Sequence, residues 1–514
     1  MTERQIAPWY RLVVIGPCQK QPCQKTIEAD RQLHDSQVDA ESAVIAGSTR
    51  TFWRPEYVFV PIFLLFGAIF VFLIPPGWNS DEPAHIMRAQ QLSTGKIFAD
   101  VNIGTNGAKE IGGDIPVGIR DLLVATRVWG EGGVFDSNFT VGNVHALVST
   151  EAETGQATVS VDFRNTAIYS PIAYLPQMPA FWVGKILSLS FASIVLLGRL
   201  FGLITVAAAV FFAIRLTPIG KWVFFAVALL PAFVSQAASF SADPAVLGFA
   251  TLFAAYLMRV ILQERAPRTG QYAALLAIGV GLSLTKVAYA PLLVLVFLIP
   301  LCNRQARTRK DFLSAGLGLL MAVLPALVWS KLVGPATTVS LNPAADPSNQ
   351  LSGIIDHPIA FARVVYRTFL TTELPGDLLS SFFGNFVWLT TPLPTAYVCL
   401  AVYALIASVL VRDPRETRWL DPGPAIWYFR GGLLLVAAGT VLVVAAGIYI
   451  TFSAVDARVV EGLQGRYFLA VLPLAMLAFY GNTLLRQRAV NLSIVVVVVV
   501  VLLGGVAALV NRLY

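Results

Sequence analysis

Long uninterrupted runs of apolar residues dominate the chain, and they predict membrane-spanning α-helices. Each run is about 20 residues long, the length that a helix needs to cross the hydrocarbon core of a bilayer. Backbone N–H and C=O groups find no water there, so each span must satisfy them internally as a helix, whereas a β-barrel would show alternating segments of about ten residues. The pattern predicts an all-α membrane protein with about eleven spans, near residues 57–74, 192–214, 222–238, 244–263, 272–285, 288–301, 312–333, 392–411, 431–451, 467–484 and 490–510.

Polar segments divide the chain around these runs. Residues 1–56 are polar, mixed in charge and without the apolar core of a signal peptide, so we expect a cytoplasmic tail that is mostly disordered. Residues 57–485 form the main transmembrane module, and residues 486–514 form a C-terminal transmembrane helix. Two long loops are expected on the extracytoplasmic side, a large first loop at about 75–191 and a second at about 334–390.

The placement of these loops follows from basic residues. With the tail inside, five clusters of Lys and Arg, which follow the spans ending near residues 214, 263, 301, 411 and 484, all fall on the cytoplasmic side. Residues 169–189 are apolar enough to span and would invert this arrangement. Their three prolines oppose a straight helix, so we expect an interfacial or partly inserted helix instead.

The composition excludes a soluble globular domain. Hydrophobic residues make up 56% of the 514 residues and charged residues only 13%, against about a quarter in soluble domains. The mean hydropathy is +0.68. A net charge of +7 would suit a nucleic-acid partner, but basic cytoplasmic loops explain it, and we expect the lipid bilayer and no nucleic acid as a partner. The four cysteines, Cys18, Cys23, Cys302 and Cys399, indicate no disulfide framework.

An acidic pair follows the first span directly. Asp81 and Glu82 stand a few residues beyond the hydrocarbon edge, and His85 comes four residues after Asp81. Carboxylates so close to low dielectric need partners, which points to a general base, a metal ligand or both. The alternative is a solvated turn in which Ser80 or Asp81 caps the helix that starts near Pro83.

Three other polar features are expected on the same side of the membrane. Gln464, Arg466 and Tyr467 stand at the mouth of a late span, where the donors of Arg466 suit a phosphate and the bland alternative is an interfacial anchor. Lys286, with Tyr289 three residues on, interrupts an apolar stretch, which is costly unless the side chain snorkels or serves as a second phosphate-binding cation.

Asp243 falls in a short turn between two spans. It either joins Asp81 and Glu82 around one pocket or caps the next helix, with Pro244 in its first turn. A divalent metal among Asp81, Glu82 and Asp243 stays open, and no other cofactor is indicated because no Walker loop, dinucleotide fingerprint or cysteine metal site is present. Arg199 lies inside a span and needs a partner.

These motifs resemble a known group of membrane proteins. An acidic pair after the first span, a large first loop and many spans resemble the GT-C superfamily of membrane glycosyltransferases. Asp81-Glu82-Pro83, Ser239 to Asp243, Lys286 to Tyr289 and Gln464-Gly465-Arg466-Tyr467 are similar to a bacterial membrane-protein family of unknown function that is grouped with GT-C enzymes. The resemblance covers about residues 57–485.

The resemblance implies an enzyme of the bacterial inner (plasma) membrane. It would transfer a sugar from a polyprenyl-phosphate donor to an envelope glycan or lipid at the outer face, with Asp81 as base or acceptor-orienting group and Glu82 second. Lys286, Tyr289, Arg466 and Tyr467 would hold the lipid phosphate, and His85, Asp243 and Gln464 complete the expected substrate site. The alternatives are a flippase or transporter of lipid-linked glycans and a non-catalytic partner in envelope assembly.

Overall fold

The computed structural model describes residues 54–103, 109–126, 157–334, 340, 342–370, 375–411, 424–481 and 487–514. The chain divides into two units, Met1–Arg54 and Pro55–Tyr514. The first unit, with the predicted tail and with Cys18 and Cys23, lies outside the described residues apart from Arg54. All that follows concerns the second unit.

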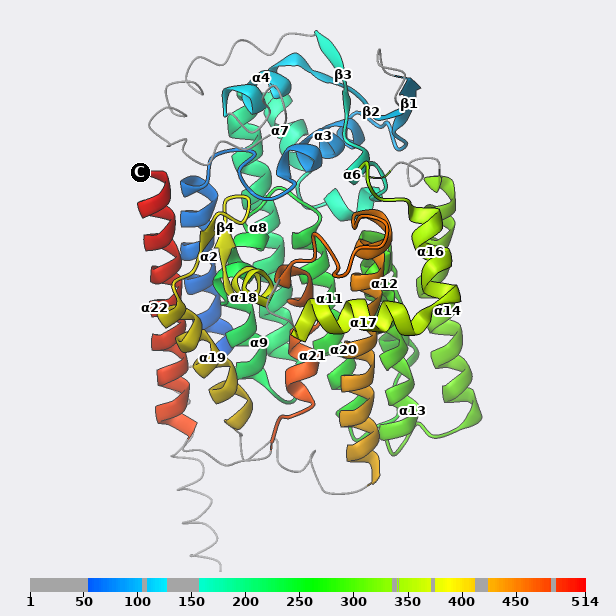
Figure 1. The fold of residues 1–514 in the computed structure, drawn as a ribbon. Helices are drawn as coiled ribbons and strands as arrows, with labels where there is room; N and C mark the ends of the chain where they lie inside the picture. Colours follow the sequence, from blue (N-terminus) through cyan, green and yellow to red (C-terminus); the bar gives the residue numbers. More distant parts are fainter. Residues whose placement is uncertain are drawn as a thin grey trace, which may run out of the picture. The chain divides into compact units, whose positions relative to one another are not determined.

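Six described helices are long and apolar enough to cross a membrane, and they run side by side in Figure 1. Each carries an uninterrupted apolar window, so its backbone bonds are closed within the helix and lipid can solvate its side chains. The α11 window is the most enclosed of the six, whereas that of α14 is the most exposed. The six helices are α2 Pro55–Leu73, α8 Phe191–Leu216, α11 Asp243–Leu262, α14 Arg309–Leu332, α20 Pro424–Thr451 and α22 Gln487–Leu513.

The other five predicted spans have shorter or broken helices, so the count of eleven is not established. Three are single apolar segments, α12 Thr269–Thr285, η2–α13 Val287–Cys302 and α19 Thr395–Leu410. The predicted span 222–238 divides into α9 Lys221–Ala228 and α10 Pro231–Ala237. In the predicted span 467–484, which the structure describes up to residue 481, the helical pieces are η4 Gly465–Phe468 and α21 Leu472–Leu477. Prolines explain both breaks, because Pro231 and Pro473 stand in the first turn of the second piece.

The segments between α2 and α8 gather at one end of the helices, and we call them the cap (Figure 1). Its antiparallel sheet has the order β1-β2-β3, with Val101 opposite Ile111 and Gly113 opposite Val161. The cap elements are α3 Glu82–Ser93, β1 Asp100–Ile103, β2 Lys109–Pro116, α4 Val117–Ala125, β3 Thr158–Asp162, α6 Arg164–Ala167, η1 Pro171–Tyr174 and α7 Pro179–Leu187.

The ambiguous stretch 169–189 belongs to this cap. It forms only the turn η1 and the nine-residue helix α7. A helix of nine residues is about 14 Å long and cannot cross a hydrocarbon core of about 30 Å. Neither piece is therefore a span, and an interfacial position of the segment stays a prediction.

A second group of short elements follows α14. Asp346 caps α16 by accepting hydrogen bonds from the N–H groups of Ser348 and Asn349. Helix α17 lies across the direction of the long helices in Figure 1. The elements are α16 Pro347–Asp356, α17 Pro358–Leu370, α18 Pro375–Phe383, β4 Asn385–Phe386 and β5 Thr391–Pro392, of which β4 and β5 pair antiparallel.

Apolar packing fixes the helices around α11. One large cluster of buried side chains joins α2, α8, α9, α10, α11 and η2, and the rings of Phe59, Phe63 and Phe233 meet within it. A second cluster fills the cap and reaches the bundle through Phe240, whose ring packs against Phe181. Because Phe240 lies three residues before Asp243, this contact holds the start of α11 against the cap.

Candidate functional site

The turn after α2 gives Asp81 an unusual backbone conformation. Asp81 stands at the N-cap of α3 with φ 64°, in the left-handed region, which costs an L-residue free energy although Asp tolerates it better than most. Its side chain makes no capping hydrogen bond and is 41% exposed. The capping alternative therefore does not describe Asp81, and its carboxylate points elsewhere.

That carboxylate meets Arg466, and a chain of ion pairs continues from there. Arg466 Nη2 donates to Asp81 Oδ2 at 2.7 Å, and Arg466 Nη1 lies 3.8 Å from Asp243 Oδ2. Lys286 Nζ donates to Asp243 Oδ1 at 3.0 Å. We call these four residues the charged cluster; Asp81 is its most exposed member, and the Arg466 side chain is only 5% exposed. Two carboxylates thus alternate with two cations at the helix ends.

Local structure brings the four together from distant segments. Asp243 is the first residue of α11, and its two carboxylate oxygens face Lys286 and Arg466. Lys286 occupies the break between α12 and η2, and Arg466 lies in the single 3₁₀ turn η4. The three charges therefore lie where helices end or break. The sequence predicted a turn at Asp243, an interruption at Lys286 and the mouth of a span at Arg466.

Tyrosine rings surround the cations. Lys286 Nζ lies 5.6 Å from the ring centre of Tyr169 and 5.4 Å from that of Tyr467. The guanidinium of Arg466 lies 5.2 Å from the Tyr467 ring. Cation–π contacts of this length are attractive, so the rings fix the cations without neutralising them. Tyr289 is buried, and its hydroxyl donates to the backbone carbonyl of Tyr467 at 2.8 Å, which fixes the backbone that carries this ring.

His85 lies in the cap next to this cluster. Its ring stacks on Tyr169 with 5.5 Å between centres, and its Nδ1 is hydrogen-bonded to the Tyr174 hydroxyl at 2.7 Å. Burial lowers the pKa of His85 to about 4 and raises the pKa of Tyr174 well above its usual range. The imidazole is therefore neutral at physiological pH and adds no third cation.

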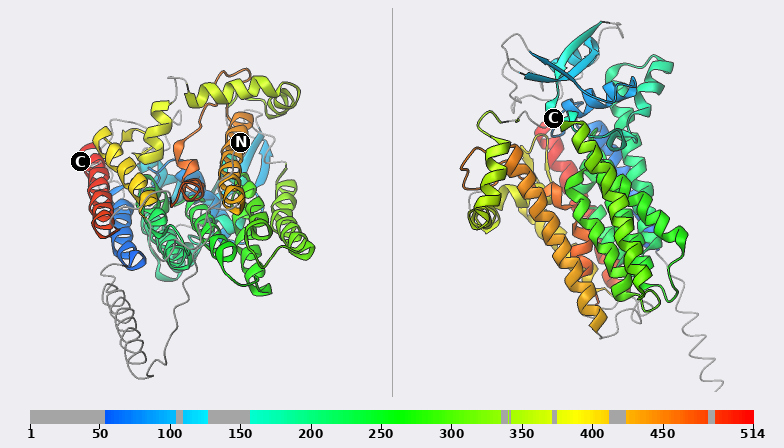
Figure 2. Two further views of the ribbon diagram at one scale, coloured as in Figure 1. Left: turned by 90° about the horizontal axis from the view of Figure 1, so that it is seen from below. Right: turned by 90° about the vertical axis from the view of Figure 1, so that its right-hand side faces the viewer.

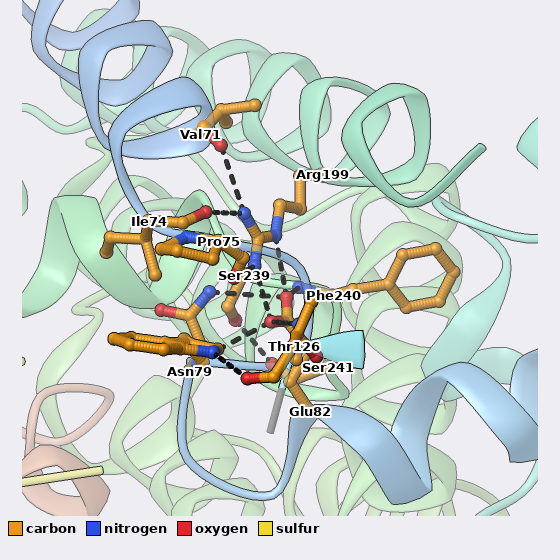
Figure 3. Close-up of polar contacts among 12 residues, drawn as sticks. Val71, Ile74, Pro75, Asn79, Glu82, Thr126, Arg199, Ser239, Phe240 and Ser241 are labelled. Atoms are coloured by element: carbon orange, nitrogen blue, oxygen red, sulfur yellow. Dashed lines mark hydrogen bonds and ion pairs between the residues drawn. The ribbon is translucent and has the colours of Figure 1, made fainter. Parts of the chain in front are cut away.

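Glu82 lies in a different environment from its neighbour Asp81. Figure 3 shows the polar contacts around Glu82. Its side chain is 0% exposed and forms an ion pair with Arg199, which is also 0% exposed. The carboxylate further accepts hydrogen bonds from the N–H groups of Gly77, Asn79 and Phe240 and from the Asn79 side chain. The oxygens of Glu82 are fully occupied, and none of these partners belongs to the charged cluster.

The remaining expectations concern metal binding and Gln464. The described residues hold no group of three His, Cys, Asp or Glu side chains arranged for a metal ion. Asp81, Glu82 and Asp243 do not form such a set, because Glu82 faces Arg199 while the other two face cations. Gln464 precedes η4, and its Oε1 is buried with no hydrogen-bond partner among the described residues.

Two neighbours of the site were not singled out from the sequence as site residues. Gln236 accepts a hydrogen bond from Arg466 Nη1 at 3.3 Å, and Tyr169 forms one side of the aromatic enclosure. Gln236 is a single amide inside an apolar run, which was the one available signal. Tyr169 was considered only as the first residue of the expected interfacial segment 169–189.

The long apolar helices and the charged cluster at their ends define a multi-pass membrane protein with a polar site beside the cap. The chain belongs to the family described as a predicted membrane protein (DUF2142), whose model matches residues 64–475. All four members of the charged cluster fall within that range. No curated protein and no solved structure matches the chain.

Proposed function

We propose that this protein is a membrane glycosyltransferase of GT-C type, which moves a sugar from a polyprenyl-phosphate donor to an envelope glycan or lipid. One observation carries the proposal: Asp81 and Arg466 meet at 2.7 Å although 385 positions separate them in the sequence. Such a transferase needs a base for the acceptor hydroxyl beside a cation for the donor phosphate. The pair supplies both.

The proposed reaction takes place at the outer face of the bacterial plasma membrane. The five basic loops support a cytoplasmic N-terminal tail and an extracytoplasmic cap. A polyprenyl chain remains in the bilayer while its phosphate reaches headgroup depth. The cations lie at the ends of apolar helices, which suits that depth.

The donor phosphate would bind Arg466 and Lys286. Arg466 offers a fork of donors to phosphate oxygens, and Lys286 adds a second positive charge. The rings of Tyr169 and Tyr467 hold both cations in place and offer flat apolar faces to the sugar. A phosphate that takes the Nη2 donor of Arg466 displaces the carboxylate of Asp81.

Displacement leaves Asp81 free as a base. The acceptor hydroxyl gives its proton to the Asp81 carboxylate, and its oxygen forms a bond to the anomeric carbon of the sugar. The bond between that carbon and the phosphate oxygen breaks, and the polyprenyl phosphate leaves with the electron pair. Arg466 and Lys286 stabilise the charge that develops on the leaving group. Donor binding therefore precedes the action of the base.

A flippase would need charged side chains along a transport path. Arg199 is a charged residue within a span, but its side chain is fully buried and forms an ion pair with Glu82, so it does not support this alternative. A partly exposed base beside the buried Arg466 favours chemistry over transport. The assembly-partner alternative predicts that Asp81 is dispensable, which the following experiment decides.

The test compares Asp81→Asn with the wild type in membranes supplied with a panel of labelled polyprenyl-phosphate hexoses and pentoses. Loss of a general base lowers kcat by about 10²–10⁴-fold. Binding of farnesyl phosphate, a short-chain probe, should stay equal or become tighter, because Asp81 no longer competes for Arg466. Arg466→Gln should instead weaken that binding.

Asp121→Asn is the matched control, because Asp121 is an exposed cap carboxylate that pairs with its neighbour Arg120. It should transfer sugar at the wild-type rate. Normal transfer by Asp81→Asn would refute the catalytic assignment. Lipid flipping by the wild type without any glycosyl transfer would favour the transporter.

A further inference from the structure

The buried pair Glu82–Arg199 connects the segments that carry the two carboxylates of the charged cluster. Arg199 comes from the middle of α8, whereas Glu82 is the first residue of α3 (Figure 3). Both side chains are 0% exposed, and no hydrogen bond or ion pair among the described residues joins either of them to the charged cluster, so neither is placed to touch a substrate.

Arg199 fastens the end of α2. Its Nη1 donates to the carbonyl oxygens of Val71 and Ile74, and its Nη2 donates to that of Pro75. The last carbonyls of a helix have no partner within the helix, and prolines at the following positions supply no N–H donor. A buried guanidinium from a neighbouring helix therefore completes the C-terminus of α2 and fixes where the next turn starts.

Glu82 forms hydrogen bonds with both segments that carry a carboxylate of the charged cluster. Its Oε2 accepts from the N–H of Gly77 at 3.0 Å, within the turn that leads to Asp81. Its Oε1 accepts from the N–H of Phe240 at 2.8 Å, three residues before Asp243. Arg466 and Lys286, in contrast, are carried by η4 and the α12–η2 break, and none of the hydrogen bonds described for Glu82 and Arg199 reaches these two segments.

We propose that Glu82 and Arg199 are positioning residues that hold Asp81 and Asp243 in register with the cations, without taking part in the reaction. The proposal rests on the proposed function for its kinetic consequence only. The left-handed backbone of Asp81 lies immediately before Glu82 in the chain, so the hydrogen bonds of Glu82 keep this strained residue from relaxing. The position of the base thus depends on its neighbour.

A double variant separates positioning from stability. Glu82→Met with Arg199→Met removes both charges together, and replacing a buried ion pair by apolar residues of similar volume is often tolerated. The variant leaves the backbone partners of Glu82 and Arg199 without side-chain bonds, so it should be less stable than the wild type. Its folded fraction should show a kcat about 100-fold lower, because an error of about 1 Å at a base has that effect. The donor KM should change less than about threefold, since the cations are held elsewhere.

The conservative variant and the control sharpen this test. Glu82→Gln keeps the shape and one acceptor oxygen, so it should recover part of the lost kcat. Asp162→Asn removes a partly buried ion pair with Arg164 in the cap sheet, away from the cluster, and should keep the wild-type kcat. A double variant whose folded fraction turns over at the wild-type kcat would show a merely structural pair and overturn the proposal.

Hydrogen exchange gives a result that does not depend on activity. Peptides covering residues 75–83 and 238–243 should exchange faster in the double variant, while those covering α14 and α20 stay unchanged. Unchanged exchange in both segments would refute positioning even in an active enzyme. If the wild type transfers no sugar, the proposed function fails alone, and the exchange result still decides whether the pair holds these segments.

Discussion

Gly465 lies where η4 packs against α18, and replacing it should displace Arg466. A Cβ atom at this position would lie 2.1 Å from the Leu378 carbonyl oxygen and 2.6 Å from the backbone nitrogen of Phe382. Both neighbours are backbone atoms of α18 and cannot rotate away. Restoring an ordinary contact of 3.4 Å requires a shift of about 1.3 Å.

A shift of that size would break the contacts of Arg466. Its bond to Asp81 is 2.7 Å long and would lengthen to about 4 Å, beyond hydrogen-bonding distance. A hydrogen bond to a charged group contributes about 1.5–3 kcal/mol. If the donor phosphate uses the same nitrogen, Gly465→Ala should weaken farnesyl phosphate binding by about 10- to 150-fold.

The assay is thermophoresis of the purified protein in detergent, with thermal unfolding measured on the same samples. Gly353→Ala is the matched control, because a Cβ at Gly353 meets open space in α16. It should bind normally and be slightly more stable, since Ala favours a helix over Gly. A Gly465→Ala protein that binds within threefold of the wild type would refute the packing argument.

Two further predictions concern pH and topology. The pKa of His85 is about 6.5 in the unfolded chain and about 4 in the folded protein, so the unfolded chain takes up the proton first as the pH falls. Neutral His85 therefore adds about 3 kcal/mol to the free energy of unfolding above pH 6.5, and this amount is lost as the pH falls toward 4. Thermal unfolding between pH 4 and 7 should show this slope in the wild type and less of it in His85→Gln; equal slopes would refute it. With the native cysteines replaced by serine, Ile103→Cys should react with an impermeant thiol reagent in intact cells, because Ile103 is 79% exposed in the cap. Lys310→Cys should react only after lysis, and the opposite pattern would reject the orientation.

The apolar pattern predicted the helices well where a run is continuous and poorly where a run hides a break. The runs at 57–74 and 490–510 correspond to the single helices α2 and α22. The run at 222–238 looks equally apolar, yet it divides because Pro231 lacks an N–H and clashes with the preceding turn. Hydropathy averages over such a residue, so it overestimates the number of uninterrupted spans.

The sequence also predicted most members of the charged cluster, but it could not show that the neighbours Asp81 and Glu82 have different partners. Asp81, Asp243, Lys286 and Arg466 were expected on one face, and the structure places them in contact. The positive φ of Asp81 sends successive side chains in unrelated directions, and no sequence pattern encodes that turn. The partnership of Glu82 with Arg199 spans 117 positions and was equally hidden.

The turn between α2 and α3 is attached at several points along its short length. Glu82 accepts hydrogen bonds from Gly77 and Asn79, and the Trp388 indole donates to the Gly77 carbonyl at 3.1 Å. The number of residues between Ile74 and Asp81 is therefore constrained by these attachments. One inserted or deleted residue would carry the wrong carboxylate to the mouth of the bundle, whereas many point substitutions there would leave the spacing unchanged.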